Sequence, residues 1–349
     1  MILHVATLDK FIPAFIELVE DNFDKSQNFF WLKGDVGKYP VGSGGNILVR
    51  GDGIWSKLRS FVRLLVLIHS SNKVVLHSLS SPKIVTILFF FPWVLPKCYW
   101  FIWGDDLYQY RNKATSVKAR RNERRRKFVI KRLGGLVTYI EGDVKLAREW
   151  YGAGGKYYEC LLYPSNVFEL PPSTNTTPEC GSGGVNILLG NSASASNNHL
   201  EVMQRMIPYK DYSFMLYVPL SYGSKEHARL VIQRGHELFG EKFKPVTNFM
   251  PYGEYVDFLL GMDVAIFNHS RQQAMGNTIL LLGMGKTVYM RTDVPQWSFL
   301  TGLGLRLRDV EDFSFSEIDA KDKERNSEIV RNYFSRNNLV GQLKKVLEG

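Results

Sequence analysis

Short apolar runs that alternate with helical segments are the feature that most constrains the fold of this chain. Parallel strands need crossover connections, usually helices, and these cover both faces of the sheet. The alternation therefore predicts an α/β fold with parallel sheets. In the first half, the runs predicted to be strands are residues 3–6, 28–32, 46–50, 74–79, 98–103 and 136–140.

One segment interrupts this alternation. Residues 170–184 read LPPSTNTTPECGSGG, without an apolar period, as expected of an interdomain linker. A second series of strands follows, and 349 residues with 45% hydrophobic content suffice for two cores. We predict two Rossmann-like parallel-sheet domains facing a cleft, at residues 1–169 and 185–320, with a C-terminal helical segment at 321–349. The second series of strands is 185–189, 214–218, 246–249, 264–267 and 287–290.

The net charge of +10 is concentrated in one segment. Nine of the fifteen residues 118–132 are Lys or Arg, opposed only by Glu123. Such a one-sided cluster predicts attraction to an anionic membrane surface, whereas nucleic acid is disfavoured because no reader module is present. The cations predicted to contact the membrane are Arg121, Arg124, Arg125, Lys131 and Arg132.

No segment is predicted to cross a membrane or to direct secretion. The apolar run at 84–95 is too short for a bilayer and suits a core helix. The N-terminal residues lead straight into a strand, without a signal sequence. The three cysteines match no zinc or redox spacing. These features predict a cytoplasmic protein.

A polar loop at 268–277 separates the strand 264–267 from a helix predicted at 278–282. A loop in this place offers free N–H groups and the positive end of a helix dipole to an anion. Arg271 adds a planar fork that fits phosphate oxygens. An ordinary strand-to-helix turn with solvated side chains is equally compatible with this stretch alone.

Two further polar loops follow strands of the same half, GNSASASNNH at 190–199 and PLSYGS at 219–224. Their side chains can cap a helix or bind a phosphate. Neither a P-loop nor a dinucleotide fingerprint is present, because the glycine-rich runs lack the required strand-to-helix setting. The three loops predict a donor site formed by Asn191, Ser192, Asn197, Tyr222, Arg271, Gln272, Gln273, Gly276 and Asn277.

Adjacent carboxylates follow the strand 98–103, at Asp105 and Asp106. A carboxylate beside aromatic groups can have a raised pKa and act as a general base, although a helix N-cap is the structural alternative. No Asp-x-Asp occurs in the chain, so ligands for a divalent metal at a diphosphate are not evident. We predict no metal and no cofactor.

With these loops, the sequence resembles the TDP-linked 4-acetamido-4,6-dideoxygalactose (N-acetylfucosamine) transferases that act on lipid II in enterobacterial common antigen synthesis. Two departures leave the donor sugar and the acceptor open: Ala193-Ser194 replaces the family's Gly-Asp, and Asp105 stands where a small residue is usual. The matching residues, in the family's order and spacing, are His4-Val5, Phe101-Ile102-Trp103-Gly104, Asp106-Leu107-Tyr108, Leu189-Gly190-Asn191-Ser192, Ser196-Asn197, His199, Val218-Pro219, Arg271-Gln272-Gln273 and Gly276.

The resemblance implies a GT-B fold, a TDP-sugar donor and an undecaprenyl-diphosphate-linked saccharide acceptor. It also implies a peripheral location on the cytoplasmic side of the bacterial inner membrane. We therefore predict a metal-independent glycosyltransferase of surface polysaccharide synthesis, either enterobacterial common antigen or O-antigen, in which Asp106 or His4 activates the acceptor. The alternatives are a fucosyltransferase that uses a GDP-sugar and a non-catalytic anion-binding protein of the membrane surface.

Overall fold

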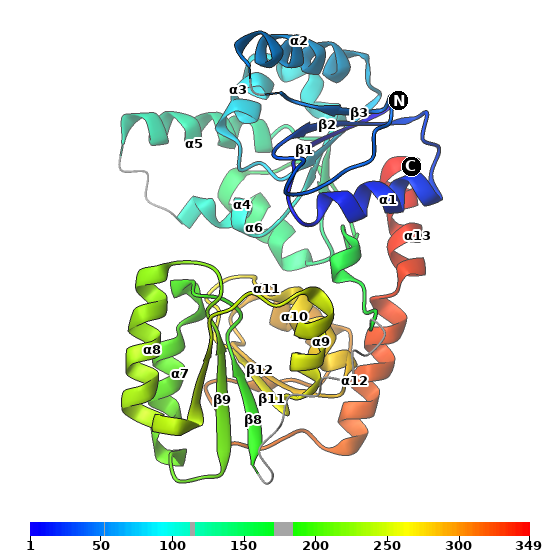
Figure 1. Cartoon of the computed structure of the whole chain (residues 1–349). Coiled ribbons are helices and arrows are strands. Elements are labelled where there is room, and N and C mark those ends of the chain that lie inside the picture. The colour runs from blue at the N-terminus through cyan, green and yellow to red at the C-terminus, as the bar shows by residue number, and fades with distance from the viewer. Residues whose placement is uncertain (52, 112–115, 171–183) are drawn as a thin grey trace. The chain divides into compact units, whose positions relative to one another are not determined.

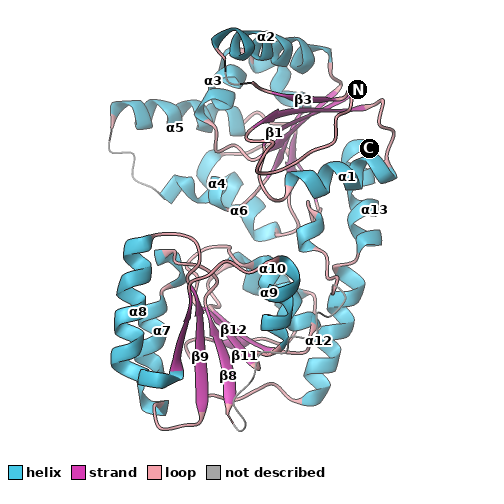
Figure 2. Cartoon of the chain, in the orientation of Figure 1, coloured by secondary structure: helices cyan, strands magenta, loops and turns pink. Residues whose placement is uncertain are grey.

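The computed structural model describes residues 1–51, 53–111, 116–170 and 184–349. The chain forms two compact units (Figures 1 and 2). Unit 1 comprises Met1–Asn166 and Arg336–Gly349, and unit 2 comprises Val167–Ser335. Most of the predicted linker, residues 171–183, lies outside the described residues.

Unit 1 contains a seven-stranded parallel sheet in the order β3-β2-β1-β4-β5-β6-β7. Its strands are β1 (Ile2–Thr7), β2 (Asn28–Lys33), β3 (Ile47–Val49), β4 (Lys73–His77), β5 (Cys98–Phe101), β6 (Gly135–Val137) and β7 (Lys156–Tyr158). Its first helices are α1 (Ile12–Asn22), α2 (Ile54–Ser70), α3 (Pro82–Phe90), α4 (Asp105–Tyr108), α5 (Val117–Ile130) and α6 (Glu141–Tyr151).

The core of unit 1 lies around the central strands. Every residue of β4 is buried, and Trp100 and Phe101 of β5 are fully buried. Strands covered on both faces are expected to read as near-continuous apolar runs, which is how their sequences were recognised. The short edge strand β7 was not predicted, because its sequence KYY is half exposed and carries no such run.

Unit 2 repeats the plan with six parallel strands in the order β10-β9-β8-β11-β12-β13. The strands are β8 (Val185–Leu189), β9 (Phe214–Pro219), β10 (Phe243–Val246), β11 (Val264–Phe267), β12 (Thr287–Met290) and β13 (Arg308–Asp309). The helices are α7 (His199–Met206), α8 (Lys225–Phe239), α9 (Tyr252–Leu260), α10 (Met275–Gly283), α11 (Pro295–Gly302) and α12 (Ala320–Tyr333).

Strand β10 differs from its prediction. It covers Phe243–Val246 instead of residues 246–249. The Phe243 ring is buried so tightly against Gly235 of α8 that a β-carbon at Gly235 would lie 2.2 Å from it. Phe249, which the prediction placed in the strand, is 81% exposed. The apolar run alone could not show which phenylalanine has a partner.

The predicted C-terminal segment 321–349 is divided between the two units. Helix α12 belongs to unit 2, and α13 (Arg336–Leu347) belongs to unit 1. In unit 1, the Gln342 side chain accepts a hydrogen bond from the Leu161 N–H at 2.8 Å. The Lys73 ammonium donates to the carbonyl of Val346 at 2.5 Å. The end of the chain therefore completes the unit in which the chain began.

The same strand order in both sheets determines where ligands are expected. The connections reverse direction between β1 and β4 in unit 1, and between β8 and β11 in unit 2. A crevice opens outside the carboxyl ends of the strands at such a reversal, and open α/β sheets bind their ligands there. The loops that follow these four strands are therefore the first places to search for a site.

Candidate functional site

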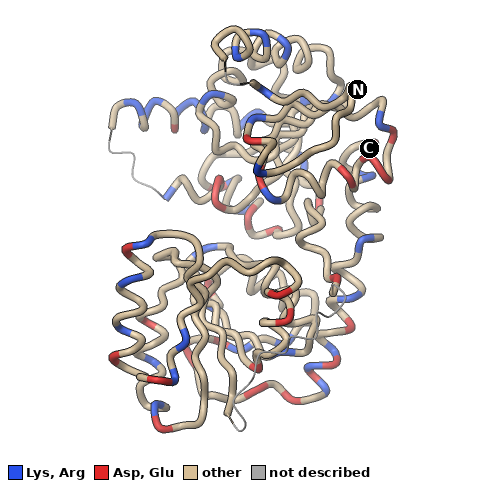
Figure 3. Tube along the Cα trace, in the orientation of Figure 1, with Lys and Arg blue, Asp and Glu red and all other residues tan. Residues whose placement is uncertain are grey.

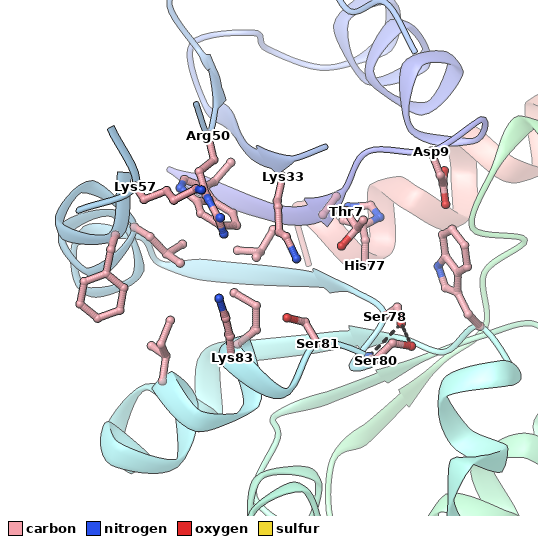
Figure 4. A pocket seen from close by; sticks show the side chains of 18 of the residues that line it. Thr7, Asp9, Lys33, Arg50, Lys57, His77, Ser78, Ser80, Ser81 and Lys83 are labelled. Carbon is pink, nitrogen blue, oxygen red and sulfur yellow. Dashed lines mark hydrogen bonds between the residues drawn. The ribbon is translucent and has the colours of Figure 1, made fainter. Parts of the chain in front are cut away.

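A pocket of about 470 Å³ lies at the carboxyl edge of the unit 1 sheet (Figure 4). Residues from the ends of β1, β2 and β4, and from α2 and α3, line it. It therefore occupies the crevice expected from the strand order. One wall is apolar and consists of Trp31, Phe61, Leu64, Ile84 and Ile87.

Four cationic side chains line this pocket: Lys33, Arg50, Lys57 and Lys83. They come from the last residue of β2, the residue after β3, α2 and α3. Figure 4 shows them gathered toward one end of the pocket. Several cations around one concave site raise the local concentration of anions and suit a ligand such as a diphosphate.

Asp9 lies toward the other end of the pocket, in the loop after β1 (Figure 4). Burial raises the pKa of this carboxyl group above its ordinary value, and the N–H of Phe11 hydrogen-bonds it at 2.8 Å. A half-buried carboxylate with a raised pKa can accept a proton from a hydroxyl group. Sequence reasoning missed Asp9, although its place after the first strand of a βα unit was a usable signal.

His4 and His77 belong to a buried hydrogen-bonded chain behind the pocket. His77 Nδ1 lies 2.7 Å from the Tyr163 hydroxyl, and His77 Nε2 lies 3.1 Å from His4 Nδ1. His4 Nε2 lies 3.1 Å from the Asn28 side-chain oxygen. If Tyr163 donates to His77, each histidine then donates from Nε2, and all these contacts are satisfied with neutral rings.

Burial keeps both histidines neutral. It lowers the pKa of His4 to about 4 and holds the pKa of His77 well below its usual range. His77 lines the pocket, but His4 is fully buried behind it. The predicted catalytic role of His4 stays untested, and in this geometry His4 could act on a pocket ligand only through His77.

Asp106 is a fully buried carboxylate at the start of α4. It accepts hydrogen bonds from the indole of Trp100 at 2.6 Å, the N–H of Leu79 at 2.8 Å and the N–H of Trp103 at 3.0 Å. These bonds hold the loops after β4 and β5. Its neighbour Asp105 lines the pocket, whereas Asp106 does not. The predicted role of Asp106 as a base stays untested.

Three of the residues predicted to bind the sugar donor, Asn191, Tyr222 and Gln273, belong to one hydrogen-bonded network at the carboxyl ends of β8, β9 and β11. Asn191 donates to the Tyr222 hydroxyl at 3.1 Å and accepts from Gln273 Nε2 at 3.0 Å. Gln273 also accepts from the Ser196 hydroxyl at 2.7 Å. These hydrogen bonds bring together loops 190–199, 219–224 and 268–277, which are separated in sequence.

Asn197 is the buried centre of this network. Its side-chain oxygen accepts from the Asn191 N–H at 2.9 Å and from His269 Nε2 at 2.8 Å. Its amide nitrogen lies 3.3 Å from the Ser192 hydroxyl. Gly190 makes this packing possible, because a β-carbon there would lie 2.6 Å from the Asn197 oxygen, and its φ of +71° favours glycine.

Two of these loops each contain a buried histidine. Burial lowers the pKa of both His199 and His269 to about 3. Among the described residues, His199 Nε2 and His269 Nδ1 have no hydrogen-bond partner. Both rings are therefore neutral at physiological pH, and His269 hydrogen-bonds the Asn197 side chain, a contact that sequence reasoning did not identify.

Helix α10 begins at Met275, three residues earlier than predicted, so Gly276 and Asn277 lie in its first turn. No side chain caps this end, which leaves the N-terminal dipole available to an anion. Asn277 donates to the Tyr255 hydroxyl at 2.7 Å. Arg271, half-buried in the loop before the helix, contacts the carbonyl of Gln272 at 3.3 Å.

The basic segment on α5 is largely at the surface of unit 1 (Figure 3). Of the cations predicted to contact the membrane, Arg121, Arg124, Lys131 and Arg132 are exposed, and Arg125 is half-buried. Arg126 differs from them, since it is buried and donates to the carbonyls of Leu79 and Asp106. This arginine therefore contributes to the structure and not to the basic surface.

Two searches of the described ranges give negative results. No helix there combines the length and hydrophobicity needed to cross a membrane. In the same part of the chain, no group of three or more His, Cys, Asp or Glu side chains is arranged to hold a metal ion. Metal independence stays a prediction.

Comparison with protein families gives a match over residues 64–319. The matching model is described as 4-alpha-L-fucosyltransferase, glycosyl transferase group 56. The matched residues include the second part of unit 1 from the end of α2 onward, with β5, and most of unit 2, with its polar loops.

Solved structures similar over nearly the whole chain include several glycosyltransferases. Alr3699/HepE of Anabaena, in complex with UDP and glucose, has a TM-score of 0.70 and 10% identity, with 99% of each chain covered. Sucrose-phosphate synthase of Thermosynechococcus elongatus has a TM-score of 0.64 and 9% identity, covering 99% of this chain and 98% of its own. WaaG, a glycosyltransferase involved in lipopolysaccharide biosynthesis, has a TM-score of 0.56 and 9% identity, and the match covers 100% of this chain and 94% of the WaaG chain. These likenesses confirm the predicted GT-B fold.

Proposed function

Because the chain belongs to the 4-alpha-L-fucosyltransferase family of glycosyl transferase group 56, we propose that it transfers a deoxy or acetamido-deoxy sugar from a TDP-sugar to a polyprenyl-diphosphate-linked saccharide. The protein is a glycosyltransferase with a GT-B fold. The nucleotide base of the donor, the transferred sugar and the acceptor are the parts of this reaction that we propose. The proposal of a diphosphate-linked acceptor rests on the unit 1 pocket, which has four cations toward one end and Asp9 toward the other.

The donor is proposed to bind at the loop network of unit 2. Tyr222 and Asn191 present polar groups that can contact the sugar or the nucleotide. Arg271 and the uncapped N-terminus of α10 are proposed to stabilise the diphosphate as negative charge develops on the leaving group. If so, Arg271→Ala weakens binding of TDP itself, and unchanged affinity in a calorimetric titration would remove Arg271 from this role.

The acceptor is proposed to bind in the unit 1 pocket. Its diphosphate would lie at the end formed by Lys33, Arg50, Lys57 and Lys83, and its saccharide would extend toward Asp9. The acceptor hydroxyl oxygen then forms a bond to the anomeric carbon while its proton passes to Asp9. The bond from the anomeric carbon to the diphosphate oxygen breaks, and TDP leaves with the electron pair.

Asp9 is preferred to the histidines as the base for a physical reason. The rings of His4 and His77 are already engaged at both nitrogens, so accepting another proton would break a buried hydrogen bond. Asp9 lines the pocket and holds a carboxyl group of raised pKa. Asp105, which also lines the pocket, provides a matched control.

We also propose a peripheral location on an anionic membrane surface, at the cytoplasmic side, because a polyprenyl-linked substrate is held there. The exposed cations on and after α5 support this proposal. The experiment incubates the full chain with a TDP-sugar and a short-chain polyprenyl-diphosphate saccharide and follows release of TDP. Release that requires the acceptor and is lost in Asp9→Asn, but kept in Asp105→Asn, supports the proposal.

A fucosyltransferase that uses a GDP-sugar is the second candidate, favoured by the description of the family. Thermal-shift titrations with TDP and GDP separate the two. Stabilisation by GDP and not by TDP would replace the proposed donor while leaving the acceptor site intact. Failure to bind any nucleotide would instead favour a non-catalytic anion-binding protein.

A further inference from the structure

Helix α2 carries two apolar faces, and one of them is exposed. Leu64 and Ile68 are each 1% exposed and belong to the core of unit 1. Ile54, Leu58, Val62 and Val66 recur at every fourth position and form a continuous row on the helix surface, which we call the outer row. Their exposed fractions are 83%, 53%, 51% and 61%.

A soluble protein normally places charged or polar groups on the outward face of a surface helix. Large exposed apolar patches mark interaction surfaces. Trp55, next to Ile54 in sequence, is 83% exposed, and Phe90 at the end of α3 and Trp93 just after it are 60% and 65% exposed. Trp93 is joined to the end of α2 by a hydrogen bond from its indole to His69 at 3.2 Å.

Cations border this apolar surface. Arg59 and Arg63 are exposed on α2, within about one helical turn after Trp55 and Leu58. The Arg125 guanidinium lies 5.6 Å from the centre of the Phe90 ring, which links the surface to the basic helix α5. An apolar row flanked by Arg and Lys complements an anionic bilayer, where apolar side chains enter the headgroup boundary and cations remain with the phosphates.

The outer row is also continuous with the proposed acceptor pocket. Lys57 and Phe61 of α2 line that pocket, as do Lys83 and Ile84 of α3. One face of α2 therefore bounds the pocket while the next face is the exposed apolar row. A ligand whose lipid tail stays in the bilayer and whose diphosphate enters the pocket would pass along this helix.

We propose that the outer row of α2, with Trp55, inserts into the surface of an anionic membrane and anchors unit 1 there. The basic surface of α5 attracts the protein to the membrane, and α2 supplies the hydrophobic contact that α5 lacks. The link to acceptor entry rests on the proposed function, but binding of α2 to a bilayer does not require any sugar donor or acceptor.

The test measures flotation of the full chain with vesicles of phosphatidylcholine, with and without phosphatidylglycerol. The wild type is expected to bind the vesicles that contain phosphatidylglycerol. The variant Leu58→Ser/Val62→Ser is expected to bind at least about tenfold more weakly, because two aliphatic side chains no longer enter the headgroup boundary of the membrane. Arg59→Gln/Arg63→Gln should weaken binding to the anionic vesicles and make it less sensitive to salt.

The matched control is Phe249→Ser, which removes an apolar side chain of unit 2 that is 81% exposed, more than either Leu58 or Val62. It should bind vesicles like the wild type. Transfer to a water-soluble, short-chain acceptor should be unchanged in Leu58→Ser/Val62→Ser, since neither residue lines the pocket. Vesicle binding by the wild type without any transfer to the water-soluble acceptor would count against the proposed function and not against the anchor.

Two results would overturn the anchor. One is equal vesicle binding by the wild type and Leu58→Ser/Val62→Ser. The other is a dimer, seen by light scattering without vesicles, that the same double substitution converts to a monomer, since the outer row would then contact a second copy of the chain. A blue shift of tryptophan emission on vesicle addition that disappears in Trp55→Ser, while binding persists, would place Trp55 in the lipid boundary.

Discussion

Mild acidification is expected to destabilise unit 2 through His199 and His269. Both rings are buried, and burial lowers the pKa of each to about 3 in the folded protein. In the unfolded chain a histidine has a pKa of about 6.5. The folded state therefore binds fewer protons, so the stabilisation is complete above pH about 6.5 and is lost as the pH falls below it.

The magnitude follows from the two pKa values. Between pH about 7.5 and about 5.5, each unfolded histidine gains most of one proton that the folded state does not take up, which lowers the free energy of unfolding by about 1.4 kcal/mol per ring. The two rings together give between about 2 and 3 kcal/mol. His227, which hydrogen-bonds His199 and also has a lowered pKa, acts in the same direction, and the positive charge of Arg271 further disfavours protonation of His269.

Hydrogen exchange of peptides from β8 and β11, followed by mass spectrometry and corrected for the intrinsic pH dependence, reports the stability of unit 2. The double variant His199→Gln/His269→Gln should lose most of the pH dependence. The exposed His236 offers a control, since His236→Gln changes a histidine at the surface of unit 2 and keeps both buried rings. An equal loss of protection on acidification in the wild type and in the double variant would refute the assignment of these rings.

Three further predictions concern the two sites. Asp9→Asn should lower turnover by about 100-fold or more, and the acidic limb of the pH profile of the wild-type kcat/KM, which reports its raised pKa, should vanish. Gly190→Ala should destabilise unit 2 by about 2 kcal/mol and weaken nucleotide binding, because φ at Gly190 is positive and a β-carbon there would clash with Asn197. A thermal-shift assay measures both effects. The control in this assay is Gly302→Ala, whose added β-carbon meets no atom within 4 Å. Gln273→Ala should weaken donor binding without unfolding the protein, since it removes two side-chain hydrogen bonds in a half-buried loop.

The strand pattern predicted most of the fold because buried parallel strands are legible in sequence. The strands β8, β11 and β12 were predicted at their observed residues, and the domain plan followed from their alternation with helices. Short edge strands such as β13 were missed, because two half-exposed residues carry no apolar period. The division of the C-terminal helices between the units depends on contacts such as that of Gln342 with Leu161, which sequence does not reveal.

The two sites differed in how far sequence could predict them. Polar residues cluster after the strands β8, β9 and β11, and Asn191, Ser196 and Gln273 of these loops do form one network, while their predicted part in donor binding stays untested. The unit 1 pocket was missed because its cations come singly from separate elements, so no local run of sequence identifies them. Asp106 is a buried hydrogen-bond acceptor for Trp100 and Leu79, which its neighbours in sequence do not reveal, and its predicted role as a base stays untested.

The most direct measurement of the central claim is the mass of the lipid-linked product formed from a TDP-sugar and a polyprenyl-diphosphate saccharide. The wild type should add one sugar residue to the acceptor and release one equivalent of TDP. The variant Lys33→Gln/Arg50→Gln should need a much higher acceptor concentration for the same rate, with its affinity for TDP unchanged. A lipid-linked acceptor whose mass does not change, although the protein binds TDP and is folded, would contradict the proposed reaction.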